Sequence, residues 1–210
     1  MLEENLRLTI RNAMILIATL LMFLPLYYAV GLYSESRAIV PALPVDYDIP
    51  FIPIFVIVYV FLFYGALIVV SAYYVLRPDS FWRYYTSLAV TLFVAIAIYV
   101  LFPTKNIIQE EQCHGVLCAI IRWYYGVDVK TNCLPSLHTA VSWVIALNVS
   151  HDKPNLSALG IATAILTTLL TLFVRQHYIL DVITGIILSF AAFFISDRLL
   201  GRISRRTRSL

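Results

Sequence analysis

The sequence contains little charge, little glycine and little proline. Only 13% of its 210 residues are Asp, Glu, Lys or Arg, whereas about 25% is usual for a soluble domain. Seven glycines and nine prolines exclude a collagen-like or low-complexity chain. Apolar residues make up 61% of the sequence, and this composition predicts an integral membrane protein with a single domain over residues 1–210.

Six apolar runs are separated by polar breaks. A transmembrane helix needs roughly 17–25 residues, and only the fourth run is shorter. A chain in lipid must satisfy its backbone polar groups internally, so all six runs are predicted to be helices. We therefore expect an all-α bundle of six transmembrane helices, at about residues 10–33, 51–76, 84–102, 135–150, 156–174 and 179–199. The first run is longer than a signal-peptide core of about 7–15 residues, and no Ala-x-Ala-like site follows it, so we do not expect it to be cleaved.

The distribution of Lys and Arg predicts the orientation of the bundle. If both termini are cytoplasmic, ten basic residues lie on the inner side and five on the outer side, which agrees with the positive-inside rule. The arginines at 202, 205, 206 and 208 are interpreted as a cytoplasmic signal on anionic lipid, and no nucleic-acid partner is expected. This topology predicts a multi-pass protein of the cell membrane, with the segments 103–134 and 175–178 at its outer face.

His177 and Asp181 form the first candidate site. On a helix, side chains at i and i+4 lie on one face. A carboxylate there accepts the Nδ1–H of the imidazole and leaves Nε2 with its lone pair, which makes His177 a candidate nucleophile toward phosphorus. The alternative is a structural polar pair at the start of the last helix.

Pro135-Ser136-Leu137-His138 forms the second candidate site. Pro suits the first turn of a helix, and Asn132 or Ser136 could cap it. The N–H groups of Ser136 and Leu137 would then bind an anion, with His138 as a general acid beside them. A buried His bonded to a backbone carbonyl is the alternative.

Two cations lie near these patches in the sequence. Lys105 follows the third apolar run and Arg175 ends the fifth. Both side chains can hold phosphate oxygens, Arg in a bidentate manner and Lys as a point charge. The alternative for each is a charge that snorkels to the membrane interface.

The cysteines lie in or beside the long third loop. A disulfide between two of Cys113, Cys118 and Cys133 is expected if the outer side is oxidising, with one thiol left free. A zinc site that adds His114 has suitable ligand types, but its spacing fits no common zinc site. Trp123-Tyr124-Tyr125 is interpreted as an interfacial anchor.

With these motifs the chain resembles the type 2 phosphatidic acid phosphatase superfamily. Pro135-Ser136-Leu137-His138 is similar to the family motif Pro-Ser-Gly-His, and His177 and Asp181 match the end of Ser-Arg-x5-His-x3-Asp. The Leu at 137 and a basic residue-Gln-His-Tyr before the Asp resemble the inositol phosphorylceramide synthase-like branch. The resemblance extends over about residues 50–190.

The sequence departs from the family pattern in three places. No Arg-Pro follows Lys105 at the family distance, and the family Arg of the third motif would fall at Thr171. Arg175 lies one helical turn further along, so it is expected on the same face. Leu137 adds bulk where a Gly would let the backbone approach a phosphate.

The resemblance implies a two-step phosphoryl transfer. His177 would form a phosphohistidine and be oriented by Asp181, and His138 would protonate the leaving group. Lys105, Arg175, Ser136 and the Leu137 N–H would stabilise the phosphate oxygens, so no metal and no cofactor are expected. Hydrolysis of a lipid phosphate or polyisoprenyl diphosphate, transfer of a head group such as inositol phosphate to a lipid alcohol, and a small transporter or channel are the competing functions.

Overall fold

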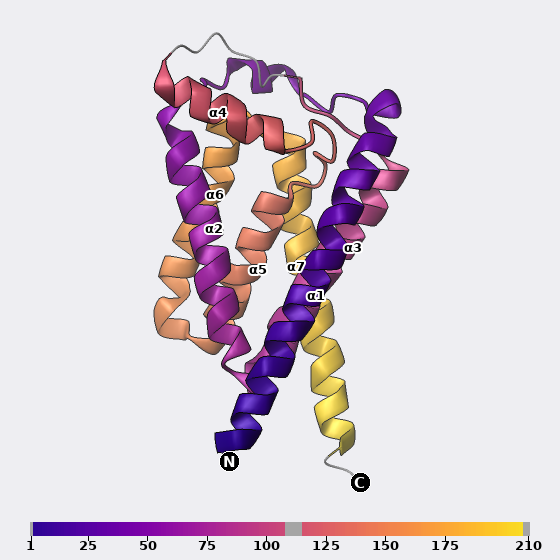
Figure 1. The fold of residues 1–210 in the computed structure, drawn as a ribbon, viewed down its shortest axis with the longest axis vertical. Helices are drawn as coiled ribbons and strands as arrows, with labels where there is room; N and C mark the ends of the chain where they lie inside the picture. Colours follow the sequence, from indigo (N-terminus) through magenta and orange to yellow (C-terminus); the bar gives the residue numbers. More distant parts are fainter. Residues whose placement is uncertain (1, 108–114, 208–210) are drawn as a thin grey trace.

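The computed structural model describes residues 2–107 and 115–207, and helices dominate both parts (Figure 1). The described residues form no β-strand, and the bridges Ile39 to Thr104 and Lys105 to Thr131 are isolated. The all-α prediction is therefore confirmed. In chain order the long helices are α1 (Leu2–Ser34), α2 (Ile54–Val75), α3 (Pro78–Leu101), α4 (Val116–Val127), α5 (Leu137–Asp152), α6 (Ser157–Phe173) and α7 (Ile179–Thr207), with short 3-10 turns at Glu35–Arg37, Pro44–Asp48 and Pro154–Leu156.

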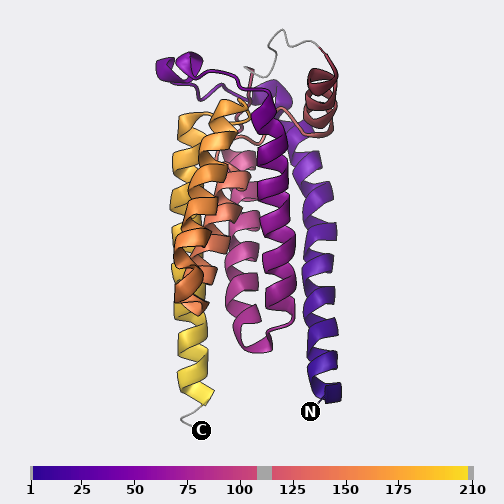
Figure 2. The ribbon, with the colours of Figure 1, turned by 90° about the vertical axis from the view of Figure 1, so that its left-hand side faces the viewer.

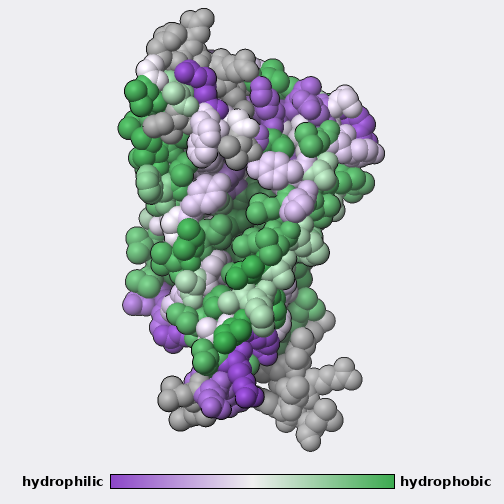
Figure 3. Space-filling view, viewed as in Figure 1, coloured by the Kyte–Doolittle hydropathy of each residue, from purple (hydrophilic) through white to green (hydrophobic). Residues whose placement is uncertain are grey.

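Among the described residues, five helices are long and apolar enough to cross a membrane. They are α1, α2, α3, α6 and α7. Figure 3 shows apolar residues over the middle of one face and hydrophilic residues at both ends, as expected for a protein that spans lipid. The fourth predicted span, at about residues 135–150, corresponds to α5, which has 16 residues and a length of about 24 Å. This helix is shorter than a hydrocarbon layer of about 30 Å.

The position of α5 in the bundle explains how such a short helix is accommodated. It packs against α2, α3, α6 and α7, and eight of its residues are buried. Its backbone polar groups are satisfied within the helix and its side chains meet protein rather than lipid, so it need not match the bilayer.

The segment predicted to be one long loop after α3 contains a helix. α4 lies across one end of the bundle (Figure 1), while the start of α1 and the end of α7 lie at the opposite end in both views (Figures 1 and 2). Trp123 is 71% exposed and suits the predicted interfacial anchor, whereas Tyr125 is buried and donates a hydrogen bond to the carbonyl of Val174. α4 is therefore tied to the turn that carries the third motif.

The start of α5 is pressed closely against α7. The Ser136 N–H donates to the carbonyl of Asp181 over 2.9 Å, and the Tyr99 hydroxyl on α3 donates to the carbonyl of Pro135 over 2.7 Å. Gly185 permits the contact, because a Cβ there would lie only 2.6 Å from the Ser136 carbonyl oxygen. These contacts bring the two sequence motifs together.

Candidate active site

His138 and His177 meet at the end of the bundle that carries α4. His138 Nδ1 lies 3.2 Å from His177 Nε2, and His177 Nδ1 lies 3.3 Å from Asp181 Oδ2. His177 is 9% exposed and Asp181 is fully buried. The structure therefore brings together the three residues that the sequence assigned to catalysis, although it does not test the roles.

The local structure around His177 differs from the prediction. His177 does not lie on the last helix with Asp181; it lies in the turn between α6 and α7, and α7 begins at Ile179. Asp181 lies in the first turn of α7, and its Oδ2 also accepts the N–H of Tyr178 over 2.9 Å. The positive end of the helix favours a carboxylate at this position. The pair is held by this turn rather than by helical i,i+4 spacing.

The hydrogen bonds define one consistent set of protons. Asp181 accepts from His177 Nδ1, so His177 Nε2 keeps a lone pair and accepts from His138 Nδ1. This assignment follows from the network, since a carboxylate can only accept. The nitrogen that faces His138 is therefore the one available to attack an electrophile.

His138 is positioned by the N-terminus of α5 and by aromatic rings. The Ser136 hydroxyl accepts the Thr139 N–H over 3.3 Å, so Ser136 rather than Asn132 caps the helix. The ring of His138 lies 4.8 Å from that of Phe63 and 5.3 Å from that of Tyr59, centroid to centroid. The Ser136 N–H is bonded to Asp181, whereas the Leu137 N–H belongs to the first turn, whose N–H groups have no acceptor within the helix.

Arg175 lies beside His177, but not on the face that was predicted. α6 ends at Phe173, and Arg175 lies in the following turn with φ of 54°. Its guanidinium donates to the carbonyl of Ile49 over 3.0 Å, and it lines a cavity of about 10 Å³ together with His177. Thr171, where the family Arg would fall, is fully buried.

Lys105 shows no described contact with His138 or His177. Its backbone N–H donates to the carbonyl of Ile39 over 2.9 Å, and it is not among the residues that line the described cavities beside His138 and His177. A role of Lys105 in phosphate binding remains a prediction.

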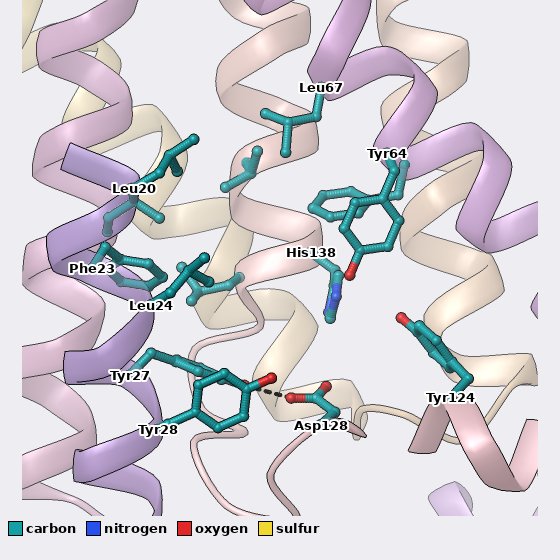
Figure 4. Close-up of a pocket in the computed structure, with 14 residues that line it drawn as sticks. Leu20, Phe23, Leu24, Tyr27, Tyr28, Tyr64, Leu67, Tyr124, Asp128 and His138 are labelled. Carbon is teal, nitrogen blue, oxygen red and sulfur yellow. Dashed lines mark hydrogen bonds between the residues drawn. The ribbon is translucent and has the colours of Figure 1, made fainter. Parts of the chain in front are cut away.

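A cavity of about 220 Å³ opens from His138 between α1, α2, α3 and α5 (Figure 4). Apolar side chains line its far part, and hydroxyl groups of tyrosines surround the part near His138. The lining residues are Leu20, Phe23, Leu24, Tyr27, Tyr28, Phe63, Tyr64, Leu67, Leu92, Tyr124, Asp128, Leu137, His138 and Val141. A smaller cavity of about 20 Å³ continues to His177 and shares Tyr27, Asp128, Leu137 and His138. The combination suits a ligand with a hydrocarbon part and a polar end.

Asp128 is a site residue that the sequence reasoning missed. It follows α4 and lines both cavities that reach His138. Burial raises the pKa of its carboxyl, although hydrogen bonds from Tyr27 and the Val129 N–H and the nearby His177 oppose the increase. Asp128 belongs to none of the motifs. The one sequence signal was a charged residue between two apolar ones, Val127 and Val129.

The cysteines agree with a single disulfide. Cys118 is disulfide-bonded, whereas Cys133 is a buried free thiol. A bonded Cys118 is not available as a thiolate ligand, and no group of three His, Cys, Asp or Glu suited to a metal occurs among the described residues. The remaining residues of the zinc candidate, Cys113 and His114, lie outside the described part of the chain.

Comparison with known proteins identifies the family. The chain matches the PAP2 superfamily over residues 48–195, a range that contains both His residues and Asp181. It therefore belongs to that superfamily. The chain is also 34% identical, over 141 residues, to an uncharacterized protein of Methanocaldococcus jannaschii, and the match covers 65% of this chain and 57% of that protein. No solved structure matches.

Members of this superfamily are generally phosphatases or related enzymes. The long apolar helices of this chain are consistent with a membrane protein.

Proposed function

We propose that this protein is a membrane lipid phosphatase that hydrolyses a lipid phosphate or a polyisoprenyl diphosphate through a phosphohistidine. One observation carries the proposal: Asp181, His177 and His138 form an ordered chain at the polar end of an apolar cavity. The cavity provides space for hydrocarbon, and the chain provides a nucleophile with an oriented lone pair.

In the first half-reaction, His177 Nε2 attacks phosphorus and the bond to the leaving oxygen breaks. His138 gives its proton to that oxygen. Arg175, Lys105 and the backbone N–H of Leu137 stabilise the equatorial oxygens, so fixed cations take the place of a metal. In the second half-reaction, water attacks the phosphohistidine and phosphate leaves.

The contact between the two His rings sets a condition on substrate binding. The phosphorus must come between His177 Nε2 and the proton donor, but these nitrogens are only 3.2 Å apart. The two rings therefore have to separate when the substrate enters, and catalytic contacts in an empty site commonly differ from those in the reacting complex.

The active site is proposed to face the outer side of the cell membrane. The start of α1 and the end of α7 lie at the end of the bundle away from α4 (Figure 2), and the excess of basic residues favours the cytoplasm for that end. A lipid could then keep its chains in the bilayer and present its phosphate to His177.

A phosphotransferase is the second candidate. Leu137 and the segment before Asp181 resemble the inositol phosphorylceramide synthase-like branch, and the chemistry up to the phosphohistidine is the same. The acceptor would be a lipid alcohol or another alcohol instead of water. A transporter is the weakest candidate, because the described His–His–Asp chain lies near one end of the bundle rather than along its middle.

The test is an assay of purified protein with a panel of lipid phosphates, with and without inositol or another alcohol. His177→Ala should abolish turnover, while His151→Ala, an exposed His at the other end of the bundle, should not change it. Release of inorganic phosphate in both conditions supports the phosphatase, and a new phosphodiester product supports the transferase. Normal turnover by folded His177→Ala protein would overturn the mechanism.

A further inference from the structure

Asp128 presents one carboxylate oxygen to the reaction cavity. The Tyr27 hydroxyl and the Val129 N–H both donate to Oδ1, over 3.1 Å and 2.8 Å. In Figure 4 the other oxygen points into the cavity, on the side of His138. Asp128 also lines the smaller cavity that His138 and His177 share. If Asp128 only linked α1 to the segment after α4, Oδ1 alone would be needed, because both hydrogen bonds are made to that oxygen.

The charge of Asp128 is unusual for a site that binds phosphate. A carboxylate beside the phosphate position repels the substrate anion unless a proton or a hydroxyl group lies between them. Burial raises the pKa of this carboxyl, so taking up a proton costs less than it would for an exposed Asp. Asp128 is therefore well placed to accept a proton from a hydroxyl group that lies between its carboxylate and the phosphate.

His138 is less free to serve the same purpose. Its Nδ1 faces His177, and the rings of Tyr59 and Phe63 pack against it. When the imidazolium of His138 gives a proton to the leaving group it becomes a neutral imidazole, and it must regain that proton before the next cycle. A second group that accepts a proton from the attacking hydroxyl could return that proton to His138.

We propose that Asp128 is the general base of the second half-reaction and binds the hydroxyl of the water or lipid alcohol that attacks the phosphohistidine. The inference rests on the proposed function. The hydroxyl oxygen forms a bond to phosphorus, its proton passes to the free carboxylate oxygen of Asp128, and the N–P bond breaks with its electron pair returning to His177 Nε2. Transfer of the proton from Asp128 to His138 restores the general acid.

The position of Asp128 also defines where the attacking hydroxyl lies. Asp128 lines both the apolar cavity of about 220 Å³ and the small cavity that reaches His177, so the hydroxyl would lie where the two cavities meet. A lipid alcohol could keep its hydrocarbon among Leu20, Leu24 and Leu67 while its hydroxyl meets the carboxylate (Figure 4). Water can occupy the same position when no alcohol is present.

The experiment separates the two half-reactions by rapid quench. Radiolabelled phosphatidic acid, or a radiolabelled polyprenyl phosphate if the wild-type protein turns it over faster, is mixed with purified protein and the bound label is followed. Asp128→Asn should form the phosphoenzyme at the wild-type rate but lose it about 10²-fold more slowly, the lower range for general base catalysis. The phosphoenzyme should therefore accumulate. Asp48→Asn, which removes an exposed carboxylate, is the matched control.

Two further measurements distinguish catalysis from folding. Hydroxylamine is a nucleophile that needs no base, so it should restore label release in Asp128→Asn, and it cannot rescue a misfolded protein. Tyr27→Phe removes the hydrogen bond to Oδ1 but keeps the carboxylate, so its effect on release should be smaller than that of Asp128→Asn.

The outcomes are distinct. If wild-type protein forms no phosphoenzyme, the proposed function fails and the inference fails with it. If wild-type protein forms one, the inference alone is overturned by any of three results: unchanged release in Asp128→Asn, equal slowing of formation and release without rescue, or an equal effect of Tyr27→Phe.

Discussion

Gly185 on α7 lies against the start of α5, the helix that carries His138. Its nearest neighbour for an added Cβ is the Ser136 carbonyl oxygen at 2.6 Å, and ordinary contact begins at 3.4 Å. Gly185→Ala must therefore move the start of α5 away from α7 by about 0.8 Å, the difference between these two distances. Because His138 follows Ser136 by two residues, it moves away from His177.

Gly185→Ala is expected to lower turnover much more than it lowers the free energy of unfolding. Overpacking costs typically about 1–3 kcal/mol, but replacing Gly by Ala inside a helix returns about 1 kcal/mol. The net loss of stability is therefore expected to be small. A displacement near 1 Å in an active site can reduce the rate about 10²-fold, so turnover should fall far more than stability.

The assay compares phosphate release and thermal unfolding of Gly185→Ala in detergent. Gly65→Ala is the matched control, because Gly65 is also helical and a Cβ there meets no atom within 4 Å. We expect Gly65→Ala to keep wild-type turnover and to unfold at the same or a higher temperature. Wild-type turnover by Gly185→Ala would show that the α5–α7 contact does not position His138.

Three other outcomes are expected. Asp181→Asn should reduce turnover strongly, by analogy with the roughly 10⁴-fold loss when an orienting Asp is neutralised in a triad, and steady-state kinetics on protein of unchanged melting temperature checks this. Tyr99→Phe leaves the buried carbonyl of Pro135 without its hydroxyl donor and should lower stability by about 1–3 kcal/mol in a denaturation assay. In a cysteine-free background, single-cysteine reporters at 40–48 should react with an impermeant thiol reagent added to sealed cells, whereas a reporter beside Lys153 should not; the reverse pattern would invert the topology.

Much of the fold could be predicted because lipid imposes simple rules on the sequence. Long apolar runs have to become helices, and the predicted runs at 10–33, 51–76 and 84–102 fall on α1, α2 and α3. The His177 and Asp181 pair was also predictable, since a His and an Asp four residues apart next to an apolar run suggested a paired site. The positions of the residues along the chain carry this information directly.

The remaining features depend on contacts between distant segments. His177 and Asp181 pair through a turn and not along a helix, because Arg175 adopts a left-handed conformation after α6 ends. Asp128 lies in the site beside α1, where the hydroxyl of Tyr27, 101 residues away in the sequence, donates to its carboxylate. No periodicity or spacing in the sequence reports such a contact.

Leu137, which replaces the Gly of the family motif, changes the shape of the cavities beside His138. Its side chain lines both the apolar cavity and the small polar cavity beside His177, so it stands at the passage between them. A Gly at this position would leave that passage wider, because it has no side chain. The Leu instead narrows the space between the two cavities, which in the proposed function a phosphate would enter to reach His177. In the proposed function, Leu137 would therefore lie between the hydrocarbon part of a substrate and its phosphate end.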